Sequence, residues 1–547
     1  MAGRQKVRTK ASKRARLLLA SAAGLGLVAL ASPSWAARCE DLTRLQLPDT
    51  VIKSAVTVPA GDAAAIGKGA PADLPAFCRV VAEVKAAPDS DVLVEVWLPL
   101  EHWAGVFHGT GNGGFAGLLA SGYPAMQAGL RRHYATATTD MGTAPATPLI
   151  GDPLVGHPRK WKDWGKLSTH TMTVTGKAIA KAFYSAPAKR AYFTGCSTGG
   201  QQGLIEAQYY PEDYDGILVG APVVNRTWGH AAAVWDWLAA NGSPGAKLSD
   251  AKLAFLNKAA IADCAGKGNG LASDPFIADP TACRFDPGVL TCKGAASDAC
   301  LTDAEVRTVR AYYSGPQDRA GHATYFGWLP GSEAPVGLSW SFIESPPGGQ
   351  PAFGGLFKWV FGKDWDWRKF DFDRDMPKVD AMLGPDLNGV TRGDMSRFRA
   401  RGGKLIIFQG WADPLVSPAQ TLDFYKRLSR KAGGTAKAQR FARLFFAPGM
   451  MHCGGGPGPG DFNSAAGGHP PSPTAGDDLF FALSRWVEDG EAPRRVIATR
   501  YADGLPAKGV AMRRPLCAWP QKAWYKGSGD TNDDASFVCA AKRPAKS

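Results

Sequence analysis

The sequence lacks the features that mark several large classes of protein. After residue 31 it contains no apolar run long enough to span a bilayer. No block of Lys and Arg alternates with aromatic residues, so nucleic-acid binding is not expected. None of its ten cysteines forms a CxxC pair or a Cys/His cluster, so a structural zinc site is not expected. No internal repeat is visible, and a repeat architecture is therefore not expected either.

Residues 1–37 have the pattern of a secretory signal peptide. Seven Lys and Arg residues precede an apolar run at residues 17–31, and Ser34-Trp35-Ala36 offers small residues for cleavage. A membrane anchor needs about 20 apolar residues, and this run is shorter and interrupted by glycines. The sequence therefore predicts a secreted or periplasmic protein with no membrane partner after cleavage. The formal net charge of +14 includes those seven residues. The smaller positive charge of the chain after cleavage supports only weak affinity for anionic surfaces.

An even number of cysteines in an exported chain predicts disulfide bonds. The count alone leaves their connectivity open. They are Cys39, Cys78, Cys196, Cys264, Cys283, Cys292, Cys300, Cys453, Cys517 and Cys539.

Strand and helix patterns alternate in two separate parts of the chain. Helical periodicity fills residues 169–184 and 477–490, and several of the strand-like runs are almost continuously apolar, as in a parallel sheet covered on both faces. These runs are residues 91–99, 133–140, 190–195, 215–222, 404–410 and 442–449. Such alternation predicts an α/β sheet.

Between the two parts, residues 226–395 are rich in Gly, Pro and Trp, and they show no regular strand pattern. Their aromatic residues and cysteines need a core of their own, so we interpret them as an inserted second domain or lid. The predicted domains are the signal peptide (1–37), a first sheet part (38–225), the insertion (226–395) and a second sheet part (396–547).

The stretch FTGCSTGGQQG, residues 193–203, has the form of a nucleophile elbow. Such an elbow needs a strand, a sharp turn flanked by small residues and then a helix, and all three are indicated here. Ser197 stands at the turn, so we interpret it as a nucleophile rather than as part of a structural βα turn.

A base and an acid follow in the order Ser, Asp, His that α/β hydrolases use. Asp413 follows the strand-like run 404–410, and His452 follows the run 442–449. Both therefore stand at the carboxyl ends of strands, where active sites of open α/β sheets gather. His170 falls within a predicted helix, and His469 has no strand before it, so both are weaker candidates for the base.

Two cysteines flank these candidates. Cys196 precedes Ser197, and Cys453 follows His452. The Cα atoms of a disulfide lie about 4.4–6.8 Å apart, so a bond between the two would hold nucleophile and base as neighbours. This coincidence favours a catalytic elbow over a structural one.

These motifs together resemble the tannase/feruloyl esterase family, which includes the mono(hydroxyethyl) terephthalate hydrolases. The resemblance is carried by Gly-Cys-Ser-Thr-Gly-Gly, Gly-Trp-Ala-Asp-Pro and His-Cys-Gly-Gly-Gly. Further similar segments are residues 103–117, 209–222, 370–375, 398–413 and 525–539. One departure is Gln409, where many members of the family have His.

The resemblance implies an α/β-hydrolase core with a large inserted lid domain, rich in disulfide bonds. It also implies a disulfide beside the nucleophile and base, Cys196–Cys453, and the further pairs Cys39–Cys78, Cys264–Cys283, Cys292–Cys300 and Cys517–Cys539. An oxyanion hole would use the backbone N–H of Thr198, the residue after the nucleophile, and of Gly114 in an early glycine-rich loop. No Gly-Lys-Ser/Thr follows that loop, so a phosphate site is not expected.

The family also has an acidic calcium-binding loop just after a cysteine of the lid, and this chain departs from it. Ala265 stands for the first Asp of that loop and Asn269 for the second, whereas Asp274 is retained. Calcium needs several oxygen ligands. Two interpretations stay open: a structural calcium ion held by Asn269, Asp274 and the carbonyls of Leu271 and Phe276, or a degenerate loop closed by Cys264–Cys283 without a metal.

The sequence thus predicts a serine carboxylesterase that needs no cofactor for its chemistry and acts on a small aromatic ester. In the terephthalate-ester hydrolases a lid arginine binds the substrate carboxylate, but residues 340–357 contain no Arg or Lys, and Gln350 stands near that position. We therefore expect neutral hydroxycinnamate or hydroxybenzoate esters to be preferred, with Arg368 as the alternative cation. The competing hypotheses are a terephthalate-monoester hydrolase, a serine peptidase on the same core, and a non-catalytic extracellular binding protein.

Overall fold

A nine-stranded mixed β-sheet forms the centre of the part of the chain that the computed structural model describes, residues 38–62, 66–67, 71–334, 336–346, 348–464 and 470–545. The predicted signal peptide, residues 1–37, and His469 lie outside the described residues. The strand order is β1-β2-β3-β5-β4-β6-β7-β8-β9. The strands are β1 (Thr50–Val58), β2 (Phe77–Val84), β3 (Val92–Pro99), β4 (Val106–Thr110), β5 (Ala135–Thr139), β6 (Arg190–Cys196), β7 (Gly216–Gly220), β8 (Lys404–Gly410) and β9 (Ala442–Ala447).

The sheet has an antiparallel part and a parallel part. Strands β1, β2, β3 and β5 pair antiparallel. Strands β5, β4, β6, β7, β8 and β9 pair parallel, so the carboxyl ends of β6, β8 and β9 meet at one edge. Two small antiparallel pairs follow in the chain: β10 (Arg495–Tyr501) with β11 (Val510–Cys517), and β12 (Lys522–Tyr525) with β13 (Phe537–Ala540).

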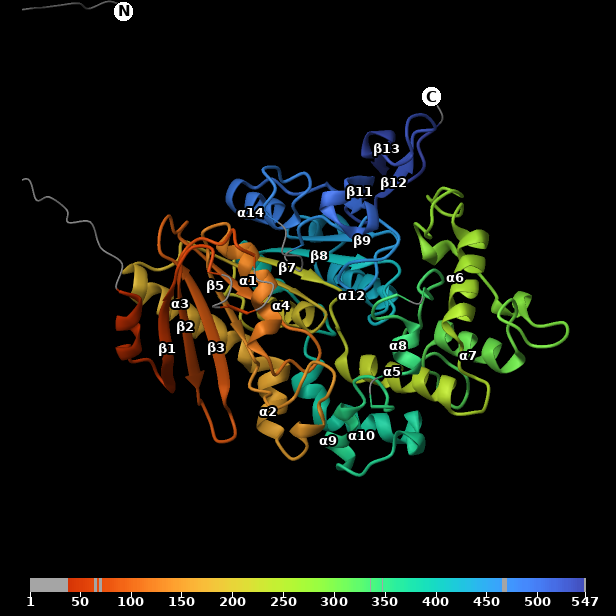
Figure 1. Cartoon of the computed structure of the whole chain (residues 1–547), viewed down its shortest axis with the longest axis horizontal. Coiled ribbons are helices and arrows are strands. Elements are labelled where there is room, and N and C mark those ends of the chain that lie inside the picture. The colour runs from red at the N-terminus through yellow and green to blue at the C-terminus, as the bar shows by residue number, and fades with distance from the viewer. Residues whose placement is uncertain are drawn as a thin grey trace, which may run out of the picture. The chain divides into compact units, whose positions relative to one another are not determined.

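Helices cover both faces of the sheet (Figure 1). Alternate residues of a strand point to opposite faces. In β6, Phe193 accordingly joins the core cluster that contains residues of α3 and α4, whereas Tyr192 joins the cluster that contains residues of α14. The helices outside the β7–β8 connection are α1 (Tyr123–Leu130), α2 (Pro158–Lys162), α3 (Ser168–Tyr184), α4 (Thr198–Tyr209), α12 (Pro418–Lys431), α13 (Thr435–Ala438) and α14 (Leu479–Asp489).

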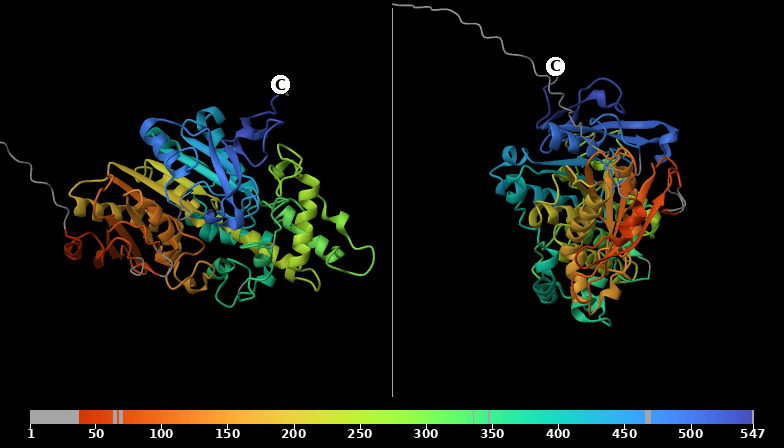
Figure 2. Two further views of the ribbon diagram at one scale, coloured as in Figure 1. Left: turned by 45° about the horizontal axis from the view of Figure 1, so that its top comes forward. Right: turned by 90° about the vertical axis from the view of Figure 1, so that its left-hand side faces the viewer.

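The connection from β7 to β8 is a long helical insertion, and its described residues add no strand to the sheet. Its helices are α5 (Arg226–Asn241), α6 (Asp250–Cys264), α7 (Asp303–Ser314), α8 (Trp340–Glu344), α9 (Gly355–Phe361), α10 (Phe372–Leu387) and α11 (Ser396–Ala400). Figures 1 and 2 show α5 to α7 at the far side of the sheet from β1. The insertion carries much of its own core, with α5 to α8 sharing one apolar cluster.

The described residues all belong to one compact unit, so the domain boundaries predicted at residues 225 and 395 stay a prediction. None of the described helices is both long enough and apolar enough to cross a membrane.

Candidate active site

Ser197 lies at the sharp turn between β6 and α4. Its backbone has φ 63° and ψ −120°, a conformation that non-glycine residues rarely adopt and that is found at functional sites. The turn depends on small neighbours, because a Cβ atom on Gly195 would lie 2.6 Å from the carbonyl oxygen of Gly199. The local structure is thus the strand–turn–helix of a nucleophile elbow.

Asp413 and His452 meet at the carboxyl ends of β8 and β9. The Nδ1 atom of His452 lies 2.9 Å from Oδ2 and 3.1 Å from Oδ1 of Asp413. The carboxylate is fully buried, and its Oδ1 also accepts hydrogen bonds from the backbone N–H groups of Leu415 and Val416. These contacts fix the orientation of the acid and, through it, of the imidazole ring.

Gln409 completes the support of the acid. Its Nε2 donates to Asp413 Oδ2 at 2.8 Å, and its Oε1 accepts from the Thr421 hydroxyl at 2.9 Å. The sequence singles out this residue as a departure from the family without indicating a role. In the structure Gln409 orients the Asp413 carboxylate. No sequence pattern indicates this contact, because it forms only when the sheet is folded.

The disulfide bond Cys196–Cys453 joins the residues beside Ser197 and His452, with a Cα–Cα distance of 6.0 Å. The other four bonds pair the cysteines as the resemblance implies: Cys39–Cys78, Cys264–Cys283, Cys292–Cys300 and Cys517–Cys539. The described residues include no free cysteine.

Ser197 and His452 line the same pocket. Among the described residues, the Ser197 hydroxyl forms no hydrogen bond with the His452 imidazole. This does not exclude a catalytic pair, because such bonds are often long when no ligand is bound. Three aromatic residues of the insertion line this pocket, whereas Gln350 and Arg368 are not among the described residues that line it. The lining residues are Gly114, Ser197, Thr198, Val223, Arg226, Gly229, His230, Ala232, Tyr325, Trp328, Phe353, Leu415, Val416, Ser417, Gln420 and His452.

Thr198 and Gly114 lie beside Ser197, as an oxyanion hole requires. No hydrogen bond from either backbone N–H to another described residue is found, so both groups are available to a ligand. The Thr198 hydroxyl donates to the Gly114 carbonyl at 2.8 Å and so ties the two segments together. Gly114 has φ 53°, and a Cβ atom there would lie 1.8 Å from the Pro148 carbonyl oxygen, so only glycine fits.

Arg226 and His230 line the same pocket, although no sequence pattern indicates them. Both are buried, and burial lowers the pKa of His230 to about 3, so its imidazole is neutral near pH 7. The two residues are one turn apart on α5, at the start of the insertion. An arginine in a helix is usually exposed, so nothing in the sequence indicates that this one turns inward.

His170 does not line the pocket. It belongs to α3, and its Nδ1 lies 2.5 Å from Asp213 Oδ2. It is therefore engaged elsewhere, and His452 is the candidate base that the structure brings to Ser197.

In the candidate calcium loop Asp274 is paired within the protein, whereas Asn269 Oδ1 is buried without a partner among the described residues. Asp274 Oδ1 accepts from the Arg514 guanidinium at 2.7 Å, and both side chains are buried. Asn269 donates its amide to the Ala523 carbonyl at 3.0 Å. The guanidinium supplies the positive charge that a calcium ion would bring to Asp274, so these residues do not fit a calcium ion well. The carbonyls of Leu271 and Phe276 add at most neutral oxygen ligands.

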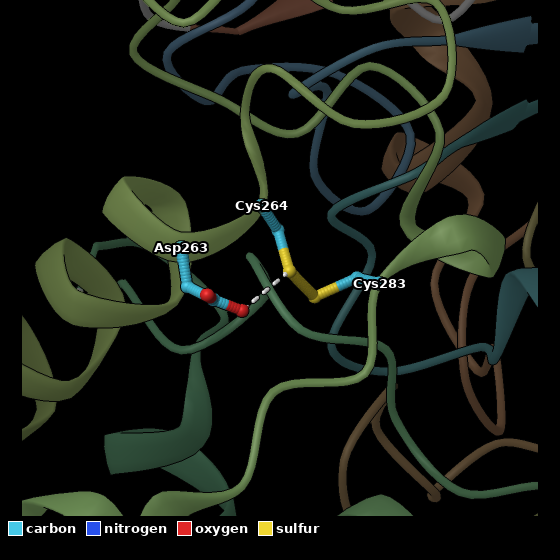
Figure 3. A group of neighbouring side chains, drawn as sticks. All are labelled: Asp263, Cys264 and Cys283. Atoms are coloured by element: carbon cyan, nitrogen blue, oxygen red, sulfur yellow. Dashed lines mark hydrogen bonds between the residues drawn. A yellow bond between two sulfur atoms is a disulfide. The ribbon is translucent and has the colours of Figure 1, made fainter.

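The nearby group Asp263, Cys264 and Cys283 is not a metal site either (Figure 3). The two sulfur atoms form a disulfide bond, so neither is a thiolate that can bind a metal. The Asp263 carboxylate lies 3.3 Å from the Cys264 sulfur and also pairs with Lys267.

Comparison with known proteins identifies the relatives of this chain. A family model described as "Tannase and feruloyl esterase" matches residues 78–340 and 364–540. An uncharacterized esterase of Xanthomonas campestris pv. campestris is 38% identical over 96% of this chain and 94% of the relative. A mono(2-hydroxyethyl) terephthalate hydrolase of Piscinibacter sakaiensis is 33% identical over 89% of this chain and 88% of its own. The crystal structure of feruloyl esterase B from Aspergillus oryzae superposes with a TM-score of 0.81 at 27% identity, covering 92% of this chain and 99% of that one. The chain belongs to the tannase and feruloyl esterase family.

Proposed function

We propose that this protein is an exported serine carboxylesterase that hydrolyses aromatic esters through an acyl-enzyme on Ser197. The observation that carries the proposal is the nucleophile elbow of Ser197 in one pocket with the His452–Asp413 pair. Membership of the family supports the reaction class. Five disulfide bonds among the described residues support export, because such bonds persist in oxidising compartments.

In the proposed reaction Ser197 Oγ attacks the ester carbonyl while His452 takes its proton. His452 then protonates the leaving alcohol, and a water molecule cleaves the acyl-enzyme with the same groups acting in reverse. Asp413 holds the imidazole in the tautomer that presents Nε2 to the serine and stabilises the imidazolium. The backbone N–H groups of Thr198 and Gly114 would stabilise the tetrahedral oxyanion, and removal of one such donor costs about 10²- to 10³-fold in rate.

The substrate we propose is an ester of a hydroxycinnamic or hydroxybenzoic acid, and the insertion acts as the lid that holds it. Tyr325, Trp328 and Phe353 give the pocket aromatic walls, and a well-placed ring pair adds about 0.5–1.5 kcal/mol beyond burial. The second candidate substrate is mono(2-hydroxyethyl) terephthalate, because one relative that matches over most of its length is named for it. Of the two interpretations of the loop of Asn269 and Asp274, we propose the one without a metal ion, because Arg514 already pairs with Asp274.

A hydrolysis panel tests the function. The purified mature protein is assayed with a p-nitrophenyl ester, methyl ferulate, methyl gallate and mono(2-hydroxyethyl) terephthalate. We expect kcat/KM for methyl ferulate or methyl gallate to exceed that for the terephthalate monoester. The reverse order would favour the second substrate, and no hydrolysis of any ester would favour a non-catalytic binding protein.

A further inference from the structure

The guanidinium of Arg226 is buried at the wall of the candidate active site. Arg226 is the first residue of α5, is only 2% exposed and lines the pocket of Ser197 and His452. Its Cζ lies 4.1 Å from the ring centre of Trp164, so one face of the guanidinium packs on the indole. The side chain is therefore held in one place and shielded from water.

No carboxylate of the described residues compensates this charge. Burial alone lowers the pKa of Arg226, to about 9, and no neighbouring charged group contributes to the shift. The guanidinium accordingly stays protonated near pH 7. A buried cation without a counter-ion is costly. An arginine in such a place is expected to meet a negative charge at some step of the protein's work.

The hydrogen bonds of Arg226 go to the first turn of α4, directly after the nucleophile. Nε donates to Gln201 Oε1, and Nη1 donates to the Thr198 hydroxyl at 3.1 Å. Nη2 donates to none of the described residues. Thr198 and Gln201 are three positions apart in α4, so one guanidinium spans the first turn of that helix.

The same contacts reach the second predicted donor of the oxyanion hole. The Thr198 hydroxyl accepts from Arg226 and donates to the Gly114 carbonyl at 2.8 Å. The indole N–H of Trp164, on which Arg226 packs, also donates to that carbonyl, at 3.1 Å. Arg226 is thus connected to both segments that carry the candidate N–H donors.

The charge of Arg226 adds to the positive end of the α4 dipole, since it lies at the amino end of that helix. In the free protein the guanidinium charge and the positive end of the helix repel one another. When the ester carbonyl becomes a tetrahedral oxyanion, a negative charge forms beside Thr198 and both contributions become favourable. The missing counter-ion would therefore be the transition state itself.

We propose that Arg226 is a positioning residue of the oxyanion hole: it fixes Thr198 and the Gly114 loop and makes that end of the pocket electropositive. The proposal rests on the serine esterase function proposed above. It assigns to the insertion a part in the chemical step, in addition to forming the pocket wall.

The test compares Arg226→Met with Arg226→Lys on a neutral ester, methyl ferulate or the best substrate of the panel. Arg226→Met should lower kcat by about 10- to 100-fold and change KM by less than about threefold, because the lost stabilisation is specific to the transition state. Arg226→Lys should recover part of kcat. Binding of a phenylboronic acid, which forms an anionic tetrahedral adduct with the serine, should weaken by a factor similar to the loss in kcat/KM.

Thr198→Val and Thr198→Ser test the hydroxyl link in a second way. Thr198→Val should lower kcat, Thr198→Ser should retain it, and the effects of Thr198→Val and Arg226→Met should be less than additive in the double variant. Arg310→Met, a change of the same type at an exposed arginine of the insertion outside the pocket, should leave kcat unchanged.

Thermal unfolding distinguishes this role from a structural one. Arg226→Met removes a buried charge but also leaves Gln201 Oε1 without its donor, so its melting temperature should stay within a few degrees of the wild type while turnover is lost. The proposal would be overturned if Arg226→Met had an unchanged kcat. It would also be overturned if the variant lost activity only because it unfolds at the assay temperature, or if the only change were a higher KM for esters that carry a carboxylate. Absence of any esterase activity in the wild type would instead overturn the proposed function.

Discussion

The sheet and the insertion contribute to the candidate site in different ways. The sheet provides Ser197, Asp413 and His452 at the carboxyl ends of β6, β8 and β9, each in a short loop after a buried strand. The insertion provides Arg226, His230 and the aromatic walls of the pocket from helices and loops that are far apart in the sequence. In the proposed mechanism the sheet would therefore determine the class of chemistry, whereas the insertion would determine which ester fits and how well the transition state is held.

The largest effect is expected from the nucleophile on the sheet side. Ser197→Ala should reduce esterase kcat by roughly 10⁴- to 10⁶-fold, because the other serine that lines the pocket, Ser417, donates its hydroxyl to the Gly327 carbonyl and does not stand at an elbow. Circular dichroism and melting temperature should show a folded protein. Activity within tenfold of the wild type would mean that the elbow is structural.

The disulfide beside the site should matter more for activity than a disulfide away from it. Cys196→Ala/Cys453→Ala opens a loop of 257 residues, which the chain-entropy model values at up to roughly 5 kcal/mol, and frees His452 from Ser197. We expect a loss of about 100-fold in kcat/KM, as small misplacements of catalytic groups produce.

The matched control for this change is Cys517→Ala/Cys539→Ala, which opens a loop of only 22 residues outside the pocket. That variant should lose stability, about 3 kcal/mol in the same model, and retain kcat. Near-normal turnover of the Cys196→Ala/Cys453→Ala variant would show that the bond does not position the site.

On the insertion side, loss of one aromatic wall should change specificity more than chemistry. Phe353→Leu should lower kcat/KM for methyl ferulate by about 2- to 12-fold, the value of one aromatic contact, and should leave p-nitrophenyl acetate hydrolysis unchanged. Phe361→Leu, in the same insertion but away from the pocket, is the control. Equal losses on both esters would mean that Phe353 supports the fold and not the substrate.

The smallest effect is expected from metal removal. Arg514 already pairs with Asp274, so treatment with a calcium chelator should shift the melting temperature by less than about 1 °C. Elemental analysis should find no stoichiometric calcium. A fall of several degrees that added calcium reverses would show instead that the loop of Asn269 and Asp274 retains a metal ion.

The sequence predicted the parts of the fold whose signals are local. The continuous apolar runs that became β6, β7, β8 and β9 and the periodic stretches of α3 and α14 are recognisable because parallel strands are buried on both faces and amphipathic helices repeat at 3.6 residues. The elbow and the order of Asp413 and His452 follow from the same strands. Strands β1, β2 and β4, by contrast, are absent from the predicted runs: β1 has few buried residues, β1 and β2 pair only in the antiparallel part of the sheet, and β4 is only five residues long.

The remaining parts of the site depend on tertiary contacts that no local pattern encodes. Gln409 contacts Asp413 because β8 presents it to the loop that follows, and Arg226 turns inward because α5 begins beside α4 and Trp164. Likewise, Arg514 reaches Asp274 across a separation of 240 residues. Such partners are recognised only in the folded structure.

The most direct test of the account is the identity of the acylated residue. The wild-type protein is mixed with an excess of a slowly deacylated p-nitrophenyl ester, quenched in acid and digested, and the peptides are analysed by mass spectrometry. The account predicts a burst of p-nitrophenol equal to the enzyme concentration and one acyl group on Ser197, absent from Ser197→Ala. An acyl group on another residue, or steady hydrolysis with neither burst nor adduct under conditions where deacylation limits turnover, would contradict it.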